Sequence, residues 1–305
     1  MSEPVNPSLP ASYAHCSAVA RRQARNFYPS FLLLPPDRRR SMCTLYAFLR
    51  QTDDIADEPG PAGAKRLALA DWRASLHRAL AGDFGPWPGW PALAETVARH
   101  GIPARHLDLV IDGVEMDTEP RVFETFDELH AYCYRVASAV GLCCLHIWGF
   151  RSDGGRAEGL AEACGLALQL TNILRDVRED AGNGRVYLPR DDMARFGVPA
   201  EALASTTTGP ALRRLLAFEG ARAYDYFERA GPLAGLVDPV GRPALRAIVG
   251  VYRALLDEIA RRDYDVLPRR VAVPRWRKVA IVAGAYVGGF ARPDAPARVE
   301  APPPR

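Results

Sequence analysis

The chain has 305 residues, 48% of them hydrophobic and 25% charged, which suits one large domain or two small ones with a buried core. Its formal net charge of +3 is too small to suggest binding to nucleic acid, and no RNA-binding signature or zinc-finger spacing is present. Six cysteines without a C-x-x-C pair favour small core residues in a reducing cytosol over disulfides or zinc. With no signal-peptide pattern and no bilayer-length apolar stretch, we expect a cytoplasmic protein whose membrane contact would be peripheral, at the inner face.

Apolar residues recur at helical spacing from Tyr13 to Phe290, and strand-like alternation is scarce. We expect a single all-α domain over 12–291, between a flexible N-terminus (1–11) and a disordered Pro/Ala-rich tail (292–305). Proline and glycine segments separate the helices. The spacing predicts helices over 12–26, 36–57, 62–81, 90–100, 104–118, 125–140, 142–149, 156–181, 191–196, 208–230, 243–262 and 274–287.

The first feature with chemical meaning is an acidic cluster at the end of the predicted helix 36–57. Asp53 and Asp57 are four residues apart and share a helix face, while Asp54 lies about 100° round the helix. Like charges at this spacing repel. A solvated acidic face would explain the pattern, but Arg50, one turn earlier, adds a guanidinium suited to phosphate.

A second polar stripe, on the predicted helix 156–181, favours a functional explanation. Asn172, Asp176 and Asp180 recur every four residues, Glu179 lies beside them, and Gln169 extends the polar face one turn back. If the two helices pack side by side, their carboxylates can converge on one cavity.

Two acidic helices and an apolar interior suggest a metal-assisted reaction of a diphosphate. Carboxylate oxygens are the ligands that Mg²⁺ prefers, and Mg²⁺ often shares them with a phosphorylated substrate. A bound metal would neutralise the departing diphosphate while a carbon–oxygen bond ionises. The apolar pocket would hold a hydrocarbon chain and exclude water from a carbocation.

At these motifs the sequence resembles the squalene/phytoene synthases, from about Tyr13 to Val287. The acidic motifs are flanked, in order, by further segments of the family pattern. These are 26–28 (NFY), 33–35 (LLP), 45–48 (LYAF), 112–117 (DGVEMD), 132–141 (YCYRVASAVG), 185–189 (RVYLP), 264–266 (YDV) and 269–271 (RRV).

The resemblance implies an isoprenoid-synthase helical bundle with a central apolar cavity, which joins two prenyl diphosphates head to head with Mg²⁺ or Mn²⁺. Its catalytic residues would be Asp53, Asp54, Asp57, Asp176, Asp180, Tyr46 and Tyr132. The metal–diphosphate residues would be Asp53, Asp57, Asn172, Asp176 and Asp180. Substrate would be bound by Arg50, Arg185 and Arg269 as diphosphate anchors, by Asn26, Gln169, Tyr187 and Tyr252, and by Val136, Ala137, Val140 and Gly141 along the prenyl channel.

Two short segments favour a particular product. The segments 24–27 (ARNF) and 275–278 (RWRK) look like those of bacterial presqualene diphosphate synthases of hopanoid pathways. We therefore expect two farnesyl diphosphates to give presqualene diphosphate. The alternative is a phytoene synthase of carotenoid pathways, which joins two geranylgeranyl diphosphates. The sequence leaves use of NADPH open, and peripheral membrane contact and pathway enzymes are further expected partners.

Two other hypotheses assign the chain a different activity or none. A class I terpene cyclase usually carries Ser or Thr at the middle of the second motif, where this chain has Asp176, which argues against that hypothesis. A catalytically inactive lipid-binding or assembly subunit would not need the complete set of carboxylates that the chain retains.

Overall fold

A computed structural model describes residues 7–24 and 27–287. Within these residues the chain is helical and contains no strand, only an isolated antiparallel bridge between Phe150 and Val237. The expected all-α, single-domain fold is therefore confirmed. The predicted tail 292–305, residues 1–6 of the predicted N-terminal segment, and Asn26 lie outside the described residues.

The helices are α1 (Leu9–Gln23), α2 (Tyr28–Phe31), α3 (Pro36–Asp57), α4 (Ala62–Leu80), α5 (Trp90–His100), α6 (Ala104–Met116), α7 (Phe126–Cys133), the π-helical turn η1 (Tyr134–Ser138), α8 (Ala139–Trp148), α9 (Arg156–Gly182), α10 (Arg190–Phe196), the 3₁₀ turn η2 (Ala200–Ala204), α11 (Pro210–Ala230), α12 (Leu233–Leu236), α13 (Arg242–Arg261) and α14 (Arg275–Val287).

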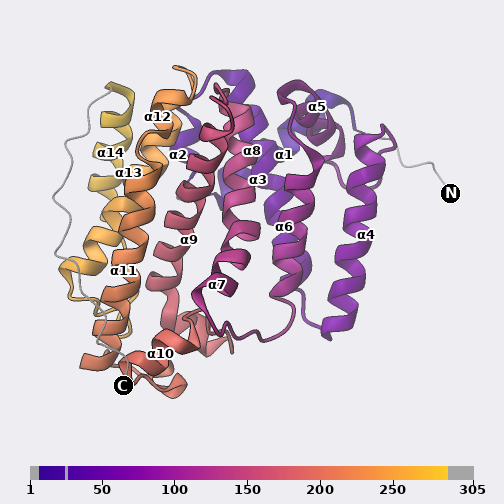
Figure 1. The fold of residues 1–305 in the computed structure, drawn as a ribbon. Helices are drawn as coiled ribbons and strands as arrows, with labels where there is room; N and C mark the ends of the chain where they lie inside the picture. Colours follow the sequence, from indigo (N-terminus) through magenta and orange to yellow (C-terminus); the bar gives the residue numbers. More distant parts are fainter. Residues whose placement is uncertain (1–6, 25–26, 288–305) are drawn as a thin grey trace.

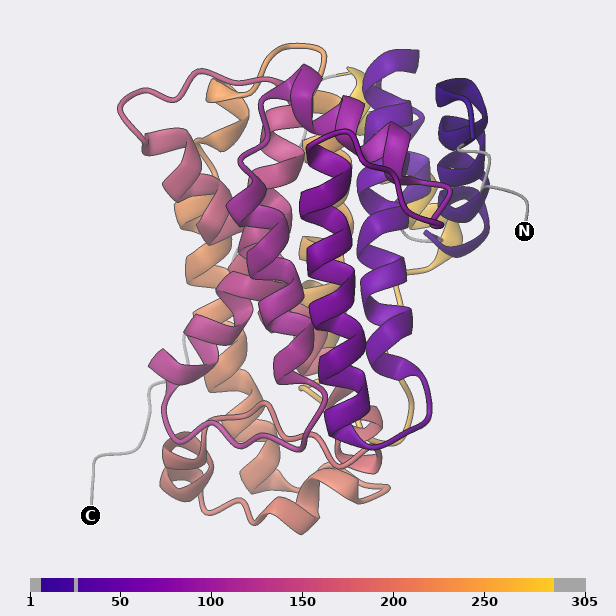
Figure 2. The same cartoon turned by 90° about the vertical axis from the view of Figure 1, so that its right-hand side faces the viewer.

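The long helices form a bundle with a common axis, and α9 runs through it in contact with α8, η1, α11 and α13 (Figure 1). The short helix α12 lies at the upper end in this view, and α10 lies at the lower end. Seen from the side, the loop between α3 and α4 also lies at the lower end (Figure 2). The carboxyl ends of α3 and α9, which carry the acidic motifs, therefore meet at the same end of the bundle.

Helix boundaries follow from local chemistry where proline marks them. Helix α3 has Pro36 in its first turn, where a missing N–H has no effect, and it covers the predicted range 36–57. Helix α1 begins at Leu9, three residues before the predicted start at Ser12. Its N-cap is Ser8, whose side chain accepts a hydrogen bond from the amide of Ala11 at 3.5 Å.

The predicted helix 125–140 is divided by the π-helical turn η1, which continues directly into α8. This turn lies against two helices at sites that have no side chain. A Cβ atom on Gly113 of α6 would lie 2.7 Å from Val136, and one on Gly165 of α9 would lie 2.6 Å from the Cα of Ser138. Close backbone packing from both sides therefore accompanies the wider turn.

The largest aromatic cluster lies in the half of the bundle built by α3, α4 and α5. The rings of Trp72 and Trp90 have centroids 4.4 Å apart, and Trp87 and Phe48 pack against them. Such contacts stabilise by burial of large apolar surfaces. None of the described helices is both long and apolar enough to cross a membrane.

Candidate functional site

A cavity of about 550 Å³ lies inside the bundle between α3, α6, η1, α8, α9 and α13. Most of its wall is apolar, as in sites that bind hydrocarbon. Its polar groups gather where α3 and α9 approach their carboxyl ends, and we call this region the polar end. The polar end is formed by Arg50, Asp53, Asp117, Tyr132, Asn172 and Arg175.

The structure places many of the predicted residues on the cavity wall. The predicted residues that line it are Tyr46, Arg50, Asp53, Tyr132, Val136, Ala137, Val140, Gly141, Gln169, Asn172 and Tyr252. The predicted residues that do not line it are Asp54, Asp57, Asp176, Asp180, Arg185, Tyr187 and Arg269. Some of them nevertheless shift the pKa values of carboxylates at the polar end, because Asp57 acts on Asp53 and Arg185 acts on Asp117.

Asp53 is the carboxylate of α3 that lines the cavity. Its side chain is exposed to solvent, yet the protein around it partly desolvates the carboxylate, and this desolvation raises its pKa to about 7. The charge of Arg50 opposes the shift, whereas Asp57 adds to it. The guanidinium of Arg50 donates its hydrogen bond to Asp54. Asp53 therefore lies among like charges without an ion-pair partner among the described residues.

Asp117, just after α6, is a cavity residue that we did not assign to the site from the sequence. Its two carboxylate oxygens accept hydrogen bonds from the phenols of Tyr132, at 2.7 Å, and Tyr187, at 2.9 Å. Burial raises the pKa of Asp117, although these hydrogen bonds and the charge of Arg185 oppose the shift. Tyr187 and Arg185 thus act on the site through Asp117 rather than from the cavity wall.

Asp176 on α9 differs from Asp53 because arginines surround it. It accepts hydrogen bonds from Nε of Arg175 at 2.8 Å and from Nε of Arg270 at 2.7 Å. Burial alone would raise its pKa, but these two arginines outweigh it, and the pKa is lowered. Asp180, one turn later, has a pKa raised to about 7 by burial and by the charge of Asp176.

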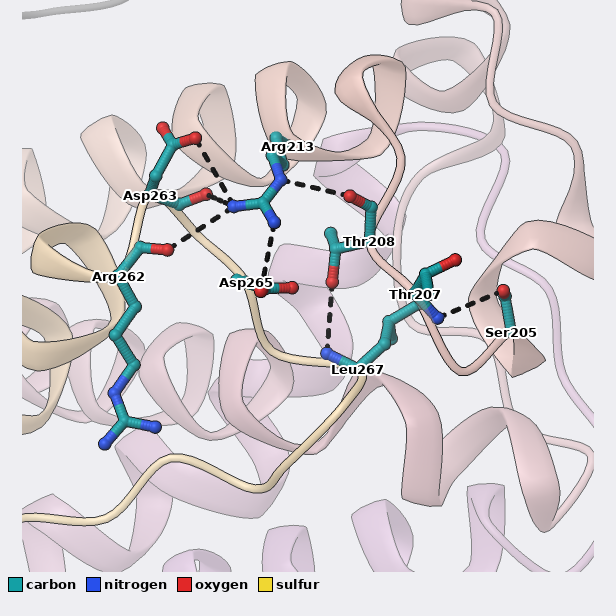
Figure 3. A network of polar contacts seen from close by, with 8 residues as sticks. All are labelled: Ser205, Thr207, Thr208, Arg213, Arg262, Asp263, Asp265 and Leu267. Atoms are coloured by element: carbon teal, nitrogen blue, oxygen red, sulfur yellow. Dashed lines mark hydrogen bonds and ion pairs between the residues drawn. The ribbon is translucent and has the colours of Figure 1, made fainter.

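Arg270 comes from the segment between α13 and α14, which polar contacts fix in place (Figure 3). Arg213 of α11 donates to the carbonyl of Asp263 at 2.8 Å and forms an ion pair with Asp265 at 3.0 Å. The amide of Leu267 donates to the Thr208 hydroxyl at 3.2 Å. This anchoring brings Arg270 onto Asp176, whereas Arg269 is exposed and lies beside it along a groove next to the cavity.

The donors at the polar end suit a hard divalent cation. They are carboxylates and one amide, and the Oδ1 atom of Asn172 is buried without a hydrogen-bond partner. Asp53 and Asp180 have raised pKa values although the charges of Arg50 and Arg185 oppose the shifts, and neither forms an ion pair within the described residues, so a cation would add positive charge there. Within the described residues no three His, Cys, Asp or Glu side chains are close enough together to hold a metal ion.

Comparison with known proteins agrees with this arrangement. The family described as squalene/phytoene synthase matches residues 20–277. The chain is 35% identical to a 15-cis-phytoene synthase of Synechococcus elongatus, over 89% of this chain and 91% of the relative. It is 33% identical to the chloroplastic phytoene synthase 2 of Solanum lycopersicum, over 93% of each chain.

Solved structures share the fold. A dehydrosqualene synthase in complex with a ligand superposes with a TM-score of 0.83 at 28% identity, over 92% of this chain and 96% of that one. The squalene synthase HpnC of Alicyclobacillus acidocaldarius superposes with a TM-score of 0.78 at 30% identity, over 84% of this chain and 95% of that one.

The expectation of a presqualene diphosphate synthase is wrong, because the curated relatives described above are named phytoene synthases. The two segments on which it rested differ in their position relative to the cavity, because Phe27 of the segment 24–27 lines it. The segment 275–278 is on α14, which contributes no residue to the cavity wall, and Asn26 is outside the described residues.

The family match covers most of the chain, and the relatives are similar over nearly their whole length. Asp53 of the first acidic motif and Asn172 of the second line the same apolar cavity. The chain therefore belongs to the squalene/phytoene synthase family and is a prenyltransferase.

Proposed function

We propose that this enzyme joins two geranylgeranyl diphosphates head to head to form phytoene. The observation that carries the proposal is the identity of 33% and 35% to two phytoene synthases over about nine tenths of the chain. The apolar cavity with one polar end supports it, because each substrate has a hydrocarbon chain and a charged head. Formation of phytoene and two diphosphates needs no reductant, so we propose that NADPH is not used.

The polar end would bind the diphosphates. Arg50 and Arg175 line the cavity there and present guanidinium groups suited to phosphate oxygens. We propose Mg²⁺, replaceable by Mn²⁺, as the metal, which when bound supplies positive charge to the departing diphosphate. Asp53, Asp57, Asn172, Asp176 and Asp180 would hold it.

The apolar wall would protect the carbocation left when the carbon–oxygen bond breaks. Val136, Ala137 and Val140 line the cavity there, and these apolar side chains together with a bound prenyl chain would exclude water. The phenols of Tyr46 and Tyr132 stay protonated because burial raises their pKa values, so they can donate hydrogen bonds or present a ring face to a cation. The double bond of the second substrate would attack the cation, and loss of a proton would give a cyclopropylcarbinyl diphosphate. This intermediate would release the second diphosphate as it ionises, and the resulting cation would rearrange and lose a second proton to give phytoene.

The test is product identification. Purified protein is incubated with Mg²⁺ and either farnesyl or geranylgeranyl diphosphate, with and without NADPH. We expect phytoene from the twenty-carbon substrate in both conditions. Turnover of the fifteen-carbon substrate alone would contradict the proposal.

We also propose that α14 contacts an anionic membrane surface, into which the hydrocarbon product can pass. Ile281 and Ala285 are buried on one face of α14. The other face exposes large apolar side chains, with Trp276 at 73% and Tyr286 at 72% of their area, and Arg275 begins the helix. An apolar stripe with basic residues is typical of helices that lie in a membrane interface.

Sedimentation with vesicles tests this contact. We expect binding to phosphatidylglycerol vesicles and weaker binding to phosphatidylcholine vesicles. The double substitution Trp276→Ser and Val279→Ser should abolish sedimentation while leaving turnover in detergent unchanged. Equal sedimentation of this variant and the unchanged protein would refute the assignment of α14.

A further inference from the structure

A second cavity, of about 750 Å³, lies beside the first and is bounded by α11, α12, α13 and α14. Much of its wall is apolar and includes Phe227, Ala254 and Ile281. Charged side chains also line it, namely Arg246, Arg253, Arg277, Glu228 and Asp257. Arg253 forms ion pairs with Glu228 at 3.2 Å and with Asp257 at 3.4 Å.

Helix α13 separates the two cavities. Ile248 and Tyr252, four residues apart, line the first cavity, while Val249 and Arg253, also four residues apart, line the second. Residues at this spacing share a helix face, so α13 presents one face to each cavity. Helix α13 is thus a wall shared by the two cavities. It offers a ligand the apolar side chain of Ile248 in the first cavity and that of Val249 in the second.

Three side chains belong to the walls of both cavities, and we call them the partition. They are Cys164 of α9, Leu233 of α12 and Leu245 of α13. All three are buried and apolar in character. Because each touches both spaces, the cavities are separated here by a single layer of side chains.

The partition lies at the end of the first cavity that is far from the polar end. Cys164 precedes Asn172 by eight residues on α9, which corresponds to about 12 Å along the helix axis. Trp148, at the end of α8, lines the same region. A prenyl chain whose diphosphate lies at the polar end would point its far end toward the partition.

The length of the longer substrate supplies a reason for such a chain to go further. A farnesyl chain has three isoprene units and a geranylgeranyl chain has four, so the geranylgeranyl chain extends further from the polar end. Cys164 of the partition lies about 12 Å from Asn172 along α9, so the additional unit is the part of the chain that would extend past the partition.

We propose that the second cavity receives the far end of a twenty-carbon prenyl chain, which passes the partition formed by Cys164, Leu233 and Leu245. This inference rests on the proposed function, because it concerns the longer substrate. Side-chain rotation of the two leucines opens the way, and the apolar floor of the second cavity binds the terminal isoprene unit. The second cavity then determines how well a twenty-carbon chain is bound relative to a fifteen-carbon chain.

Filling the second cavity tests the inference. Val249 lines the second cavity and not the first, so Val249→Phe reduces its space without touching the polar end. The matched control is Val240→Phe, at an exposed position before α13 that lines neither cavity. Binding of non-hydrolysable fifteen- and twenty-carbon thiolodiphosphates is measured by calorimetry in the presence of Mg²⁺.

We expect Val249→Phe to weaken binding of the twenty-carbon analogue about tenfold or more, which corresponds to the loss of a few methylene contacts. The affinity for the fifteen-carbon analogue should change by less than about twofold. Val240→Phe should change neither. Equal effects of Val249→Phe on both analogues, or no effect, would overturn the inference.

A photoreactive label separates this inference from the proposed function. A twenty-carbon thiolodiphosphate carrying a diazirine at its far end is irradiated in the unchanged protein, and the labelled peptide is found by mass spectrometry. Labelling of α13 at Val249 or Ala254, or of α14 at Ile281, supports the second cavity even if turnover proves restricted to farnesyl diphosphate. Labelling confined to residues that line only the first cavity, such as Phe31 and Met42, overturns it.

Discussion

The acidic motifs of α3 and α9 look alike in sequence but have different surroundings. Asp53 of α3 lies among like charges, and the neighbouring Arg50 donates to Asp54 instead. Asp176 of α9 is held by Arg175 and Arg270. Their pKa values shift in opposite directions, upward for Asp53 and downward for Asp176.

This difference suggests that α3 and α9 have different roles at the polar end. The α3 side presents oxygen ligands that still need positive charge, so a metal ion would bind there with the greatest gain. The α9 side is already supplied with arginines, of which Arg175 lines the cavity. Those arginines can turn to a diphosphate when a cation takes over part of the charge of Asp176.

The largest effect should come from removing a carboxylate charge on either side. Asp53→Asn and Asp176→Asn are each expected to lower turnover about a hundredfold or more, because charge stabilisation at the reacting diphosphate is lost. Steady-state kinetics measures the loss, and circular dichroism should show unchanged helix content. Rates like those of the unchanged protein in both variants would rule out the two-sided metal site.

A smaller effect is expected from Arg270, which forms an ion pair with Asp176 from the segment between α13 and α14. Arg270→Gln should weaken binding of a substrate thiolodiphosphate about tenfold, as one charge-assisted contact is lost. Arg269→Gln is the matched control, because Arg269 is exposed and makes no hydrogen bond or ion pair within the described part of the chain. If Arg269→Gln has the larger effect, the sequence-based choice of Arg269 as the anchor is right and the structural choice of Arg270 is not.

The smallest effect concerns stability and pH in the absence of divalent cations. Asp53 and Asp180 have pKa values of about 7 in the folded protein, against ordinary values of 3.8. Between these values the folded protein binds more protons than the unfolded chain, so these two groups make the free energy of unfolding fall as pH rises toward 7 and above.

Thermal unfolding from pH 5 to 8 in chelator measures this fall. The double variant Asp53→Asn and Asp180→Asn should lose less stability over this range than the unchanged protein, and excess Mg²⁺ should flatten the curve of the unchanged protein. Parallel curves for the two proteins in chelator would show that the pKa values of the two carboxylates are not raised in the folded protein.

Sequence reasoning succeeded where periodicity and local chemistry decide the structure. The proline start of α3 and the helical spacing around Asp53 and Asn172 led to residues that line one cavity, and the family resemblance added Tyr252. It missed Asp117, because a single carboxylate after a helix has no periodic signal and gains its role only when Tyr132 packs beside it.

The other differences between the sequence-based predictions and the structure arise from contacts between distant segments. The π-helical turn η1 depends on close approach to Gly113 and Gly165, which no local pattern reveals. The choice between Arg269 and Arg270 depends on a loop without periodicity, whose path is fixed by Arg213 of α11.

The positions of the tryptophans make intrinsic fluorescence a probe of ligand binding. Three of the five indoles, those of Trp72, Trp87 and Trp90, are packed against one another away from the cavity, where they quench and transfer excitation among themselves. Trp148 alone among the five lines the first cavity, and its Nε1 atom is buried without a hydrogen-bond partner. Trp276, the fifth, is exposed on α14, so the measurement uses a Trp276→Phe variant. A change in its emission on adding a prenyl chain would report arrival at Trp148, and filling of the apolar end could be timed separately from chemistry at the polar end.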